Sequence, residues 1–260
     1  MLTLGIFSKT LPRPTLGETL DAVRGLGIEY VQLNTVPPED CRQEFESRGL
    51  KLAVLSATFN IIHPDAEVRQ SGFERLMQLA KSAKSTGAPI LSVSTGTCDT
   101  EDMWRKHPEN GSADAWQAML QSMVVLAKIA QEHDITIAFE PEQANIVDSA
   151  QKARELLDTL RSKHVKVLMD AANLLTVANL PQQEQVLRNA FELLGRDIVA
   201  AHAKEFSQDG TLGNAVLGSG AVDFPLYTSL LRGLDLPVSL IMHGFAEQEA
   251  SASLRYLQSV

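Results

Sequence analysis

The sequence predicts an α/β fold in which residues 1–260 form a single (β/α)8 barrel of the TIM type. Short apolar runs rich in β-branched residues alternate with longer amphipathic stretches along the whole chain. Eight such pairs fit into 260 residues, a usual size for this barrel. The rival, a doubly wound open sheet, usually has fewer strands, and its nucleotide-binding form needs a glycine-rich first turn. That turn here reads "FSKTLPRPT".

The expected strands are short apolar runs, several of which lead directly into polar residues. In chain order they are "LTLGIFS" (2–8), "YVQLNT" (30–35), "KLAVLSATF" (51–59), "PILSVSTG" (89–96), "TIAFEPE" (136–142), "VKVLMDA" (165–171), "IVAAHAKE" (198–205) and "VSLIMHG" (238–244).

The stretches between these runs are expected to form helices. The first, "TLGETLDAVRGLG", places Leu16, Leu20, Val23 and Leu26 at helical spacing. Two longer helices start near polar capping residues. The expected helices after the first cover 68–87, 112–134, 149–163, 181–195, 224–234 and 249–260. No break in composition suggests a second domain.

Composition narrows the class of protein. Hydrophobic residues make up 44% and charged residues 21%, as in ordinary soluble globular proteins. The net charge of −9 and the lack of Lys/Arg-rich runs argue against a nucleic-acid partner. Cys41 and Cys98 are too few and too far apart for a disulfide framework or a cysteine-based zinc site, so a reducing, cytoplasmic location is expected. No secretion signal and no membrane span is expected either.

Four ionisable residues end four consecutive strands. Glu140, Asp170, His202 and His243 follow the apolar runs of the fifth to eighth strands, whose C-terminal ends meet at one mouth of a barrel. Burying the carboxylates there without partners would be costly, and a divalent cation would offset that cost while using the imidazoles. We therefore expect one divalent metal ion. Mixed carboxylate and imidazole ligands favour Mn or Zn, with Mg, Co or Fe also compatible.

Several motifs together resemble the xylose-isomerase-like barrel family of sugar isomerases and epimerases. They are "SATFNIIHPD", "MWRKHPEN", "FEPE", "MDAANL", "AHAKE" and "GSGAVDF". The resemblance spans nearly the whole chain, and it depends on the order and spacing of the motifs. It also allows a homo-oligomer, because family members often form dimers or tetramers.

The resemblance implies one metal held by a Glu, an Asp, a His and a second Glu from strands five to eight. Glu140, Asp170 and His202 would fill the first three places, and His243 stands in the fourth. A histidine can also ligate a divalent ion, but it changes the charge of the site. Glu247, one helical turn further on, could partly replace the missing glutamate.

The departure at His243 leaves two mechanisms open. In the family, two glutamates flank the substrate and one removes the proton next to the carbonyl. Here either His243 is a ligand and Glu140 works with another group, or His243 is free and acts as an acid or base. Lys204, Glu142 and His63 are candidates for the missing acid, and His63, Glu142 and Glu247 are also candidate substrate contacts.

Other residues are candidate substrate contacts. Trp104 and His107 could stack on a sugar ring or belong to a structured loop, and Lys204 could hold an oxyanion or pair with Glu205. Asn173 stands where many family members have a histidine that contacts substrate hydroxyls, and an amide can bind hydroxyls without supplying an acidic proton. The segment "GSGAV" (218–222) could bind phosphate through its backbone or form a loop.

The leading hypothesis is a metal-dependent isomerase or epimerase that abstracts a proton next to the carbonyl of a small sugar or keto-sugar, through an enediolate. The alternative is a metal-dependent lyase or hydratase that eliminates a group β to a keto function of an oxidised sugar or glycoside. Phosphodiester cleavage, as in related abasic-site endonucleases, is disfavoured by the net charge of −9. A non-catalytic sugar-binding barrel is the remaining alternative.

Overall fold

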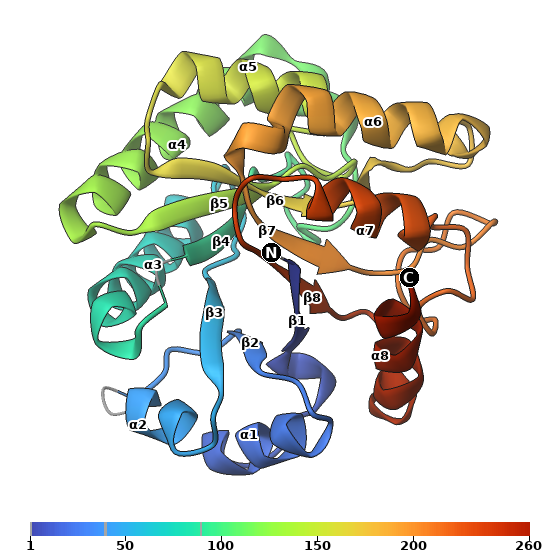
Figure 1. Cartoon of the computed structure of the whole chain (residues 1–260). Helices are drawn as coiled ribbons and strands as arrows, with labels where there is room; N and C mark the ends of the chain where they lie inside the picture. Colours follow the sequence, from blue (N-terminus) through green and yellow to red (C-terminus); the bar gives the residue numbers. More distant parts are fainter. Residues whose placement is uncertain (1, 39–40, 89) are drawn as a thin grey trace.

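The computed structural model describes residues 2–38, 41–88 and 90–260, and over these residues the chain forms a closed barrel of parallel strands (Figure 1). The strands neighbour one another in chain order, and β1 pairs with β8 to close the barrel. The predicted (β/α)8 fold is confirmed. The strands are β1 (Leu2–Phe7), β2 (Tyr30–Leu33), β3 (Lys51–Ser56), β4 (Ile90–Ser94), β5 (Thr136–Glu140), β6 (Val165–Asp170), β7 (Ile198–Ala203) and β8 (Val238–Met242).

The strands begin where the apolar runs begin, apart from the start of β4, because Pro89 lies outside the described residues. Their C-terminal ends come earlier than predicted. The third run was expected to reach residue 59, for example, whereas β3 ends at Ser56. The hydrophobic pattern continues past the last ladder hydrogen bond, because the first loop residues still pack against the barrel.

The helices surround the barrel, as Figure 1 shows, and each follows a strand. They are α1 (Leu16–Gly25), α2 (Cys41–Glu46), α3 (Ala66–Thr86), α4 (Ala113–His133), α5 (Ala150–Leu160), α6 (Gln183–Leu194), α7 (Phe224–Arg232) and α8 (Ala250–Ser259). Short 3-10 helices are Ser8–Thr10, Pro108–Gly111, Ala172–Leu174, Leu180–Gln182, Gly195–Asp197 and Glu247–Glu249.

Of the helices, α2 was not predicted. Its six residues are too few to show a helical repeat of apolar positions. The others agree with the pattern, and polar caps fix several starts. Thr15 and Glu18 form a capping box at α1, and the side chains of Ser112 and Ser149 accept backbone N–H groups at the starts of α4 and α5.

The barrel interior is filled rather than hollow. Val54, Ala138, Leu168 and Ala200 form a small apolar cluster inside the strands, separate from the large core between strands and helices. Because successive residues of a strand alternate sides, His202 points to the same side of β7 as Ala200, nearer the C-terminal end. The apolar cluster therefore lies beneath the polar residues of the barrel mouth.

None of the helices formed by the described residues is both long enough and apolar enough to cross a bilayer.

Candidate functional site

The C-terminal ends of the strands open into a cavity of about 660 Å³. This volume is in the range of small-molecule sites. Its ionisable and amide lining combines residues expected from the sequence with residues that were not. The expected ones are Glu140, Glu142, His202, Lys204 and His243, and the others are Lys9, Gln32, Asn34, Arg75 and Asn214.

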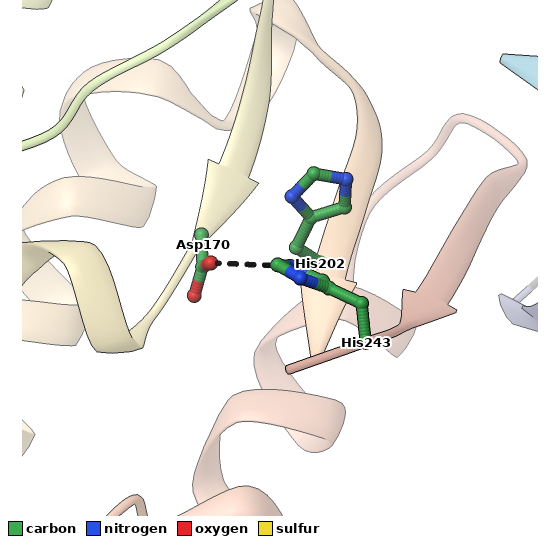
Figure 2. A group of neighbouring side chains, drawn as sticks. All are labelled: Asp170, His202 and His243. Atoms are coloured by element: carbon green, nitrogen blue, oxygen red, sulfur yellow. Dashed lines mark ion pairs between the residues drawn. The ribbon is translucent and has the colours of Figure 1, made fainter. Parts of the chain in front are cut away.

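Asp170, His202 and His243 converge at the base of this mouth (Figure 2). Asp170 ends β6, His202 lies beside it on β7, and His243 directly follows β8, where its backbone N–H donates to Ala203 O at 3.0 Å. One ligand atom from each of the three side chains lies within 4.8 Å of the others. The parallel register of three neighbouring strands thus produces a group of potential metal ligands.

Two atoms of this group are buried without a hydrogen bond: Asp170 Oδ2 and His243 Nε2, which lie 3.8 Å apart. Asp170 Oδ2 has an ion pair with Lys204, but His243 Nε2 has no other polar partner among the described residues. Leaving a buried polar atom unsatisfied is unfavourable, so this arrangement suggests a missing partner. Burial lowers the pKa of His243 to about 3, and His202 and Lys204 add to this, so the imidazole is neutral at physiological pH. A neutral imidazole beside a carboxylate is a suitable donor set for a divalent cation.

Lys204 supplies the positive charge that accompanies Asp170. Its Nζ lies 3.2 Å from Asp170 Oδ2, and it also donates to Asn173 Oδ1. Burial favours protonation of Asp170, but Lys204 and His243 outweigh it, and the pKa of this carboxyl falls below its usual range. Burial alone would lower the pKa of Lys204, yet Asp170, Glu140 and Glu142 raise it, so the amine is charged.

Glu140 is connected to this group through two neighbours. Its Oε1 accepts a hydrogen bond from Asn173 Nδ2 at 2.7 Å and lies 3.3 Å from His202 Nδ1. No hydrogen bond to its Oε2 is formed by the residues described. Glu140 therefore keeps one carboxylate oxygen for the cavity, while the other is fixed by the protein.

Gln32 contacts the second ring nitrogen of His202. Gln32 Nε2 donates to Ser92 Oγ at 3.4 Å, and its Oε1 lies 2.9 Å from His202 Nε2. In the tautomer in which Nε2 donates to Gln32, the lone pair of Nδ1 faces Glu140 Oε1, which is 3.3 Å away. A cation close to both atoms would remove the repulsion in this tautomer. Together with the unsatisfied atoms of Asp170 and His243, this arrangement fits a divalent metal.

Glu142 lines the same cavity two residues beyond Glu140. Burial raises the pKa of Glu142 to about 7, with Lys204 opposing and Glu140 reinforcing the shift. Its backbone N–H donates to Val147 O at 3.0 Å, which fixes the loop after β5.

Trp104 forms part of the rim and is 52% exposed. Three buried asparagines hold the loops around it. Asn60 Oδ1 and Asn145 Oδ1 accept backbone N–H groups of the loop after β4, and Asn110 Nδ2 donates to Ala144 O at 2.8 Å. The indole is thus presented on a fixed loop, at a place where it can cover a bound ring.

The comparison with known families agrees with this geometry. The model of the xylose isomerase-like TIM barrel family matches residues 20–260. The chain belongs to this family. The sequence has no significant match among curated proteins.

Solved structures share the fold at low sequence identity. The 3-keto-D-glucoside 4-epimerase YcjR from E. coli is 17% identical, with full coverage of both chains and a TM-score of 0.76. The probable 3-DHS dehydratase AsbF from Bacillus anthracis is 14% identical, with 98% of both chains covered and a TM-score of 0.76. The IOLI protein with a bound zinc atom is 15% identical, with 99% of this chain and 95% of that chain covered and a TM-score of 0.71.

Within this family fold, the structure does not bring His63, His107 or Glu247 to the cavity. His63 Nδ1 accepts the N–H of Asp65 and its Nε2 contacts Thr100 O, so this imidazole shapes a loop. His107 makes the same kind of turn, with Nδ1 accepting from Glu109 N at 3.2 Å. Both histidines directly precede a proline, and a His-Pro pair of this kind indicates a turn.

Glu247 lies outside the cavity at the surface, where it forms an ion pair with Arg13. It belongs to the 3-10 helix Glu247–Glu249, which turns away from the strand end after Gly244. Gly244 has a φ of 79°, and its Cα lies close to Gly213. Spacing along the chain suggested proximity to His243, but the left-handed turn at Gly244 carries the chain away.

The segment 218–222 is held by the protein itself. Glu205, which is completely buried, accepts the N–H groups of Gly218 at 2.8 Å and of Phe206 and Val222 at 3.1 Å. These donors are therefore not free for a phosphate. Glu205 also has no ion pair with Lys204, which pairs with Asp170 instead.

Proposed function

We propose that this protein is a divalent-metal-dependent isomerase or epimerase that moves a proton at the carbon next to the carbonyl of a small keto-sugar. The observation that carries the proposal is the group of Asp170, His202 and His243, with its two buried atoms that lack hydrogen bonds. The sugar epimerases among the structural relatives support the same chemistry.

Asp170, His202 and His243 would hold the metal, with Glu140 beside them through His202. A divalent ion held there would polarise the carbonyl oxygen of a substrate and stabilise negative charge on it. A hydrogen bond from His202 Nε2 to Gln32 would leave Nδ1 as the ligand atom, and Asp170 would contribute the negative charge.

Glu140 Oε2 is the proposed base. Asn173 holds the other oxygen, so the carboxylate has a fixed orientation, and Glu140 lines the cavity where a sugar carbon would lie. Glu142 and Lys204 line the same cavity, and we assign to them the handling of the proton on return. The charged Lys204 also offsets negative charge that develops on the substrate oxygen.

Elimination is the second candidate function. The feature that favours it is His243 at the end of β8, because an imidazole there replaces the second carboxylate of an epimerase. A dehydratase is also among the structural relatives. Proton abstraction by Glu140 would then be followed by loss of a group β to the carbonyl, and released product distinguishes the two reactions.

The first test is metal content. Protein purified without chelator is analysed for bound metals as wild type, as His243→Ala and as His164→Ala. His164 is a matched control, because its Nδ1 contacts Ile135 O near the N-terminal end of the barrel. We expect about one Mn or Zn per chain in wild type and in the control, and much less in His243→Ala. A wild-type protein that cannot be loaded with any metal would contradict the proposal and favour a non-catalytic sugar-binding barrel.

The second test follows the proton. Metal-loaded enzyme is incubated with keto-sugars in D2O, and the products are analysed by NMR and mass spectrometry. Epimerisation or isomerisation places deuterium on the carbon next to the carbonyl, whereas elimination releases a smaller group. Metal binding without proton exchange on any sugar offered would leave only the non-catalytic barrel.

A further inference from the structure

The cavity contains two cationic side chains that the proposed reaction does not use, Lys9 and Arg75. Lys9 lies in the 3-10 helix after β1, and Arg75 reaches the cavity from α3. Neither has a carboxylate within ion-pair distance among residues 2–38, 41–88 and 90–260. This distinguishes them from Lys204, which is neutralised by Asp170.

Arg75 is held in place by the backbone. Its Nη2 donates to Asn34 O at 2.8 Å and to Ser56 O at 3.0 Å, which places the guanidinium between the ends of β2 and β3. Its Nη1 and Nε form no hydrogen bond with the described part of the chain. The group is therefore oriented in advance, with donors left for a ligand.

Two backbone carbonyls compensate part of the burial of Arg75, but no carboxylate among the described residues does so. Burial lowers the pKa of this guanidinium, and no acidic group in the described part of the chain opposes the shift. The side chain remains charged at physiological pH, because the ordinary pKa of arginine is so high. A half-buried charge of this kind is a favourable place for an anion, which would replace the lost hydration.

Lys9 adds a second charge on the same side of the mouth. Its Nζ lies 4.4 Å from the centre of the Phe7 ring, which keeps the amine over the strand end. The neutral side chains of Asn34 and Thr58 also line this part of the cavity. The β1–β3 side thus provides cations and neutral donors, whereas the β5–β8 side provides carboxylates, imidazoles and Lys204, whose charge is paired with that of Asp170.

From this division we infer that the substrate carries an anionic group, a carboxylate or a phosphate ester, which Arg75 and Lys9 bind while its carbonyl faces the β5–β8 side. The inference rests on the proposed function for the position of the carbonyl. It adds the substrate class and a fixed direction of binding. A neutral sugar would leave both cations without an ion-pair partner among the described residues.

Binding measurements test this inference without any turnover. Three probes are titrated calorimetrically at low ionic strength: D-fructose, D-fructose 6-phosphate and 2-keto-D-gluconate. They provide a neutral sugar, a phosphate ester and a carboxylate. We expect at least one anionic probe to bind roughly tenfold or more tightly than D-fructose, and this preference to fall as salt is added. Which anion binds more tightly identifies the substituent.

Variants test which residues cause the preference for an anionic probe over D-fructose. Arg75→Met and Lys9→Met should each reduce this preference several-fold, while the affinity for D-fructose stays unchanged. Lys9 makes no side-chain hydrogen bond to the described backbone, so Lys9→Met should fold normally and stays informative if Arg75→Met folds poorly. Arg69→Met is the matched control, because Arg69 also donates to backbone carbonyls, those of His63 and Pro64, but lies outside the cavity. It should keep the full preference.

The inference is wrong if neither anionic probe binds more tightly than D-fructose, or if the preference survives in both Arg75→Met and Lys9→Met. These results are independent of the proposed function, which is tested separately by metal content and by proton exchange. A protein that binds metal and exchanges a proton of neutral sugars alone would retain the proposed function and lose this substrate class.

Discussion

The two ends of the barrel open into cavities of similar size, about 660 Å³ at the C-terminal end and about 590 Å³ at the N-terminal end. The N-terminal cavity is lined by apolar residues such as Val54 and Ala200, together with charged ones, Arg42, Glu46 and Lys51. The only group of three potential metal ligands found in residues 2–38, 41–88 and 90–260 lies at the other end. Volume alone therefore does not mark the site, but the convergence of buried polar groups does.

Charged residues also behave differently at the two ends. Near the start of β7, Asp197 pairs with Lys166 at 2.6 Å and with Arg154 at 2.8 Å, so its charge is fully compensated. At the C-terminal end, Asp170 Oδ2 pairs with Lys204 at 3.2 Å, but neither it nor His243 Nε2 forms a hydrogen bond with the described residues. Polar groups of the first kind stabilise the fold, and those of the second kind are available for a ligand.

The largest effect is expected at Glu140. Glu140→Ala should lower the turnover of the keto-sugar substrate at least about a hundredfold, because a positioned base is lost. Its thermal unfolding should stay close to that of wild type. Glu155→Ala, an exposed glutamate of α5, is the control and should keep full activity. Turnover near the wild-type rate in Glu140→Ala would remove this residue from the mechanism.

A smaller effect is expected at Gln32. Gln32→Leu keeps the size of the side chain but removes the oxygen that contacts His202 Nε2. We expect metal affinity, measured by competition with a chelator, to fall roughly 10- to 100-fold. Gln78→Leu, on the exposed face of α3, should bind metal as wild type does. Equal affinities in both variants would mean that His202 needs no support from β2.

The smallest effect is expected at the opposite end of the barrel. Burial would raise the pKa of Asp197, but hydrogen bonds from Lys166 and Arg154 lower it below its ordinary value. Because the folded-state pKa is depressed, its stabilisation is present above the unfolded pKa and is lost as pH falls through the folded one. Asp197→Asn should cost about 1 kcal/mol near neutral pH, and the difference should close below about pH 4.

Urea unfolding at several pH values measures this difference, and the metal content of the variant should equal that of wild type. A loss of metal in Asp197→Asn would contradict the view that this end of the barrel serves stability and the other end serves ligand binding. A stability difference that grows toward low pH would contradict the assigned ion pairs.

Sequence patterns predicted the fold because each strand is a mostly apolar run, and such runs mark strands that are buried on both sides. They also brought Asp170, His202 and His243 together, since the ends of consecutive parallel strands must meet. The six-residue helix α2 escaped prediction because a segment so short shows no periodicity.

The remaining site residues depend on side-chain direction, which spacing does not determine. Glu247 is close to His243 in sequence, but the turn at Gly244 separates them. Gln32 could have been recognised from the sequence, because it is a single amide inside the apolar run "YVQL". Arg75 could not have been recognised, because an arginine on an amphipathic helix normally faces solvent. Only the three-dimensional structure shows its guanidinium between two strand ends.

The position of Trp104 gives the protein a spectroscopic reporter of its own. The chain has two tryptophans, and Trp116 packs partly buried against the core from α4. Trp104 stands half exposed at the rim of the cavity, on a loop that asparagine side chains keep in place. Ligand entry would therefore change the fluorescence of one indole against the constant background of the other. Tryptophan fluorescence can therefore report ligand binding in the cavity before any substrate is known.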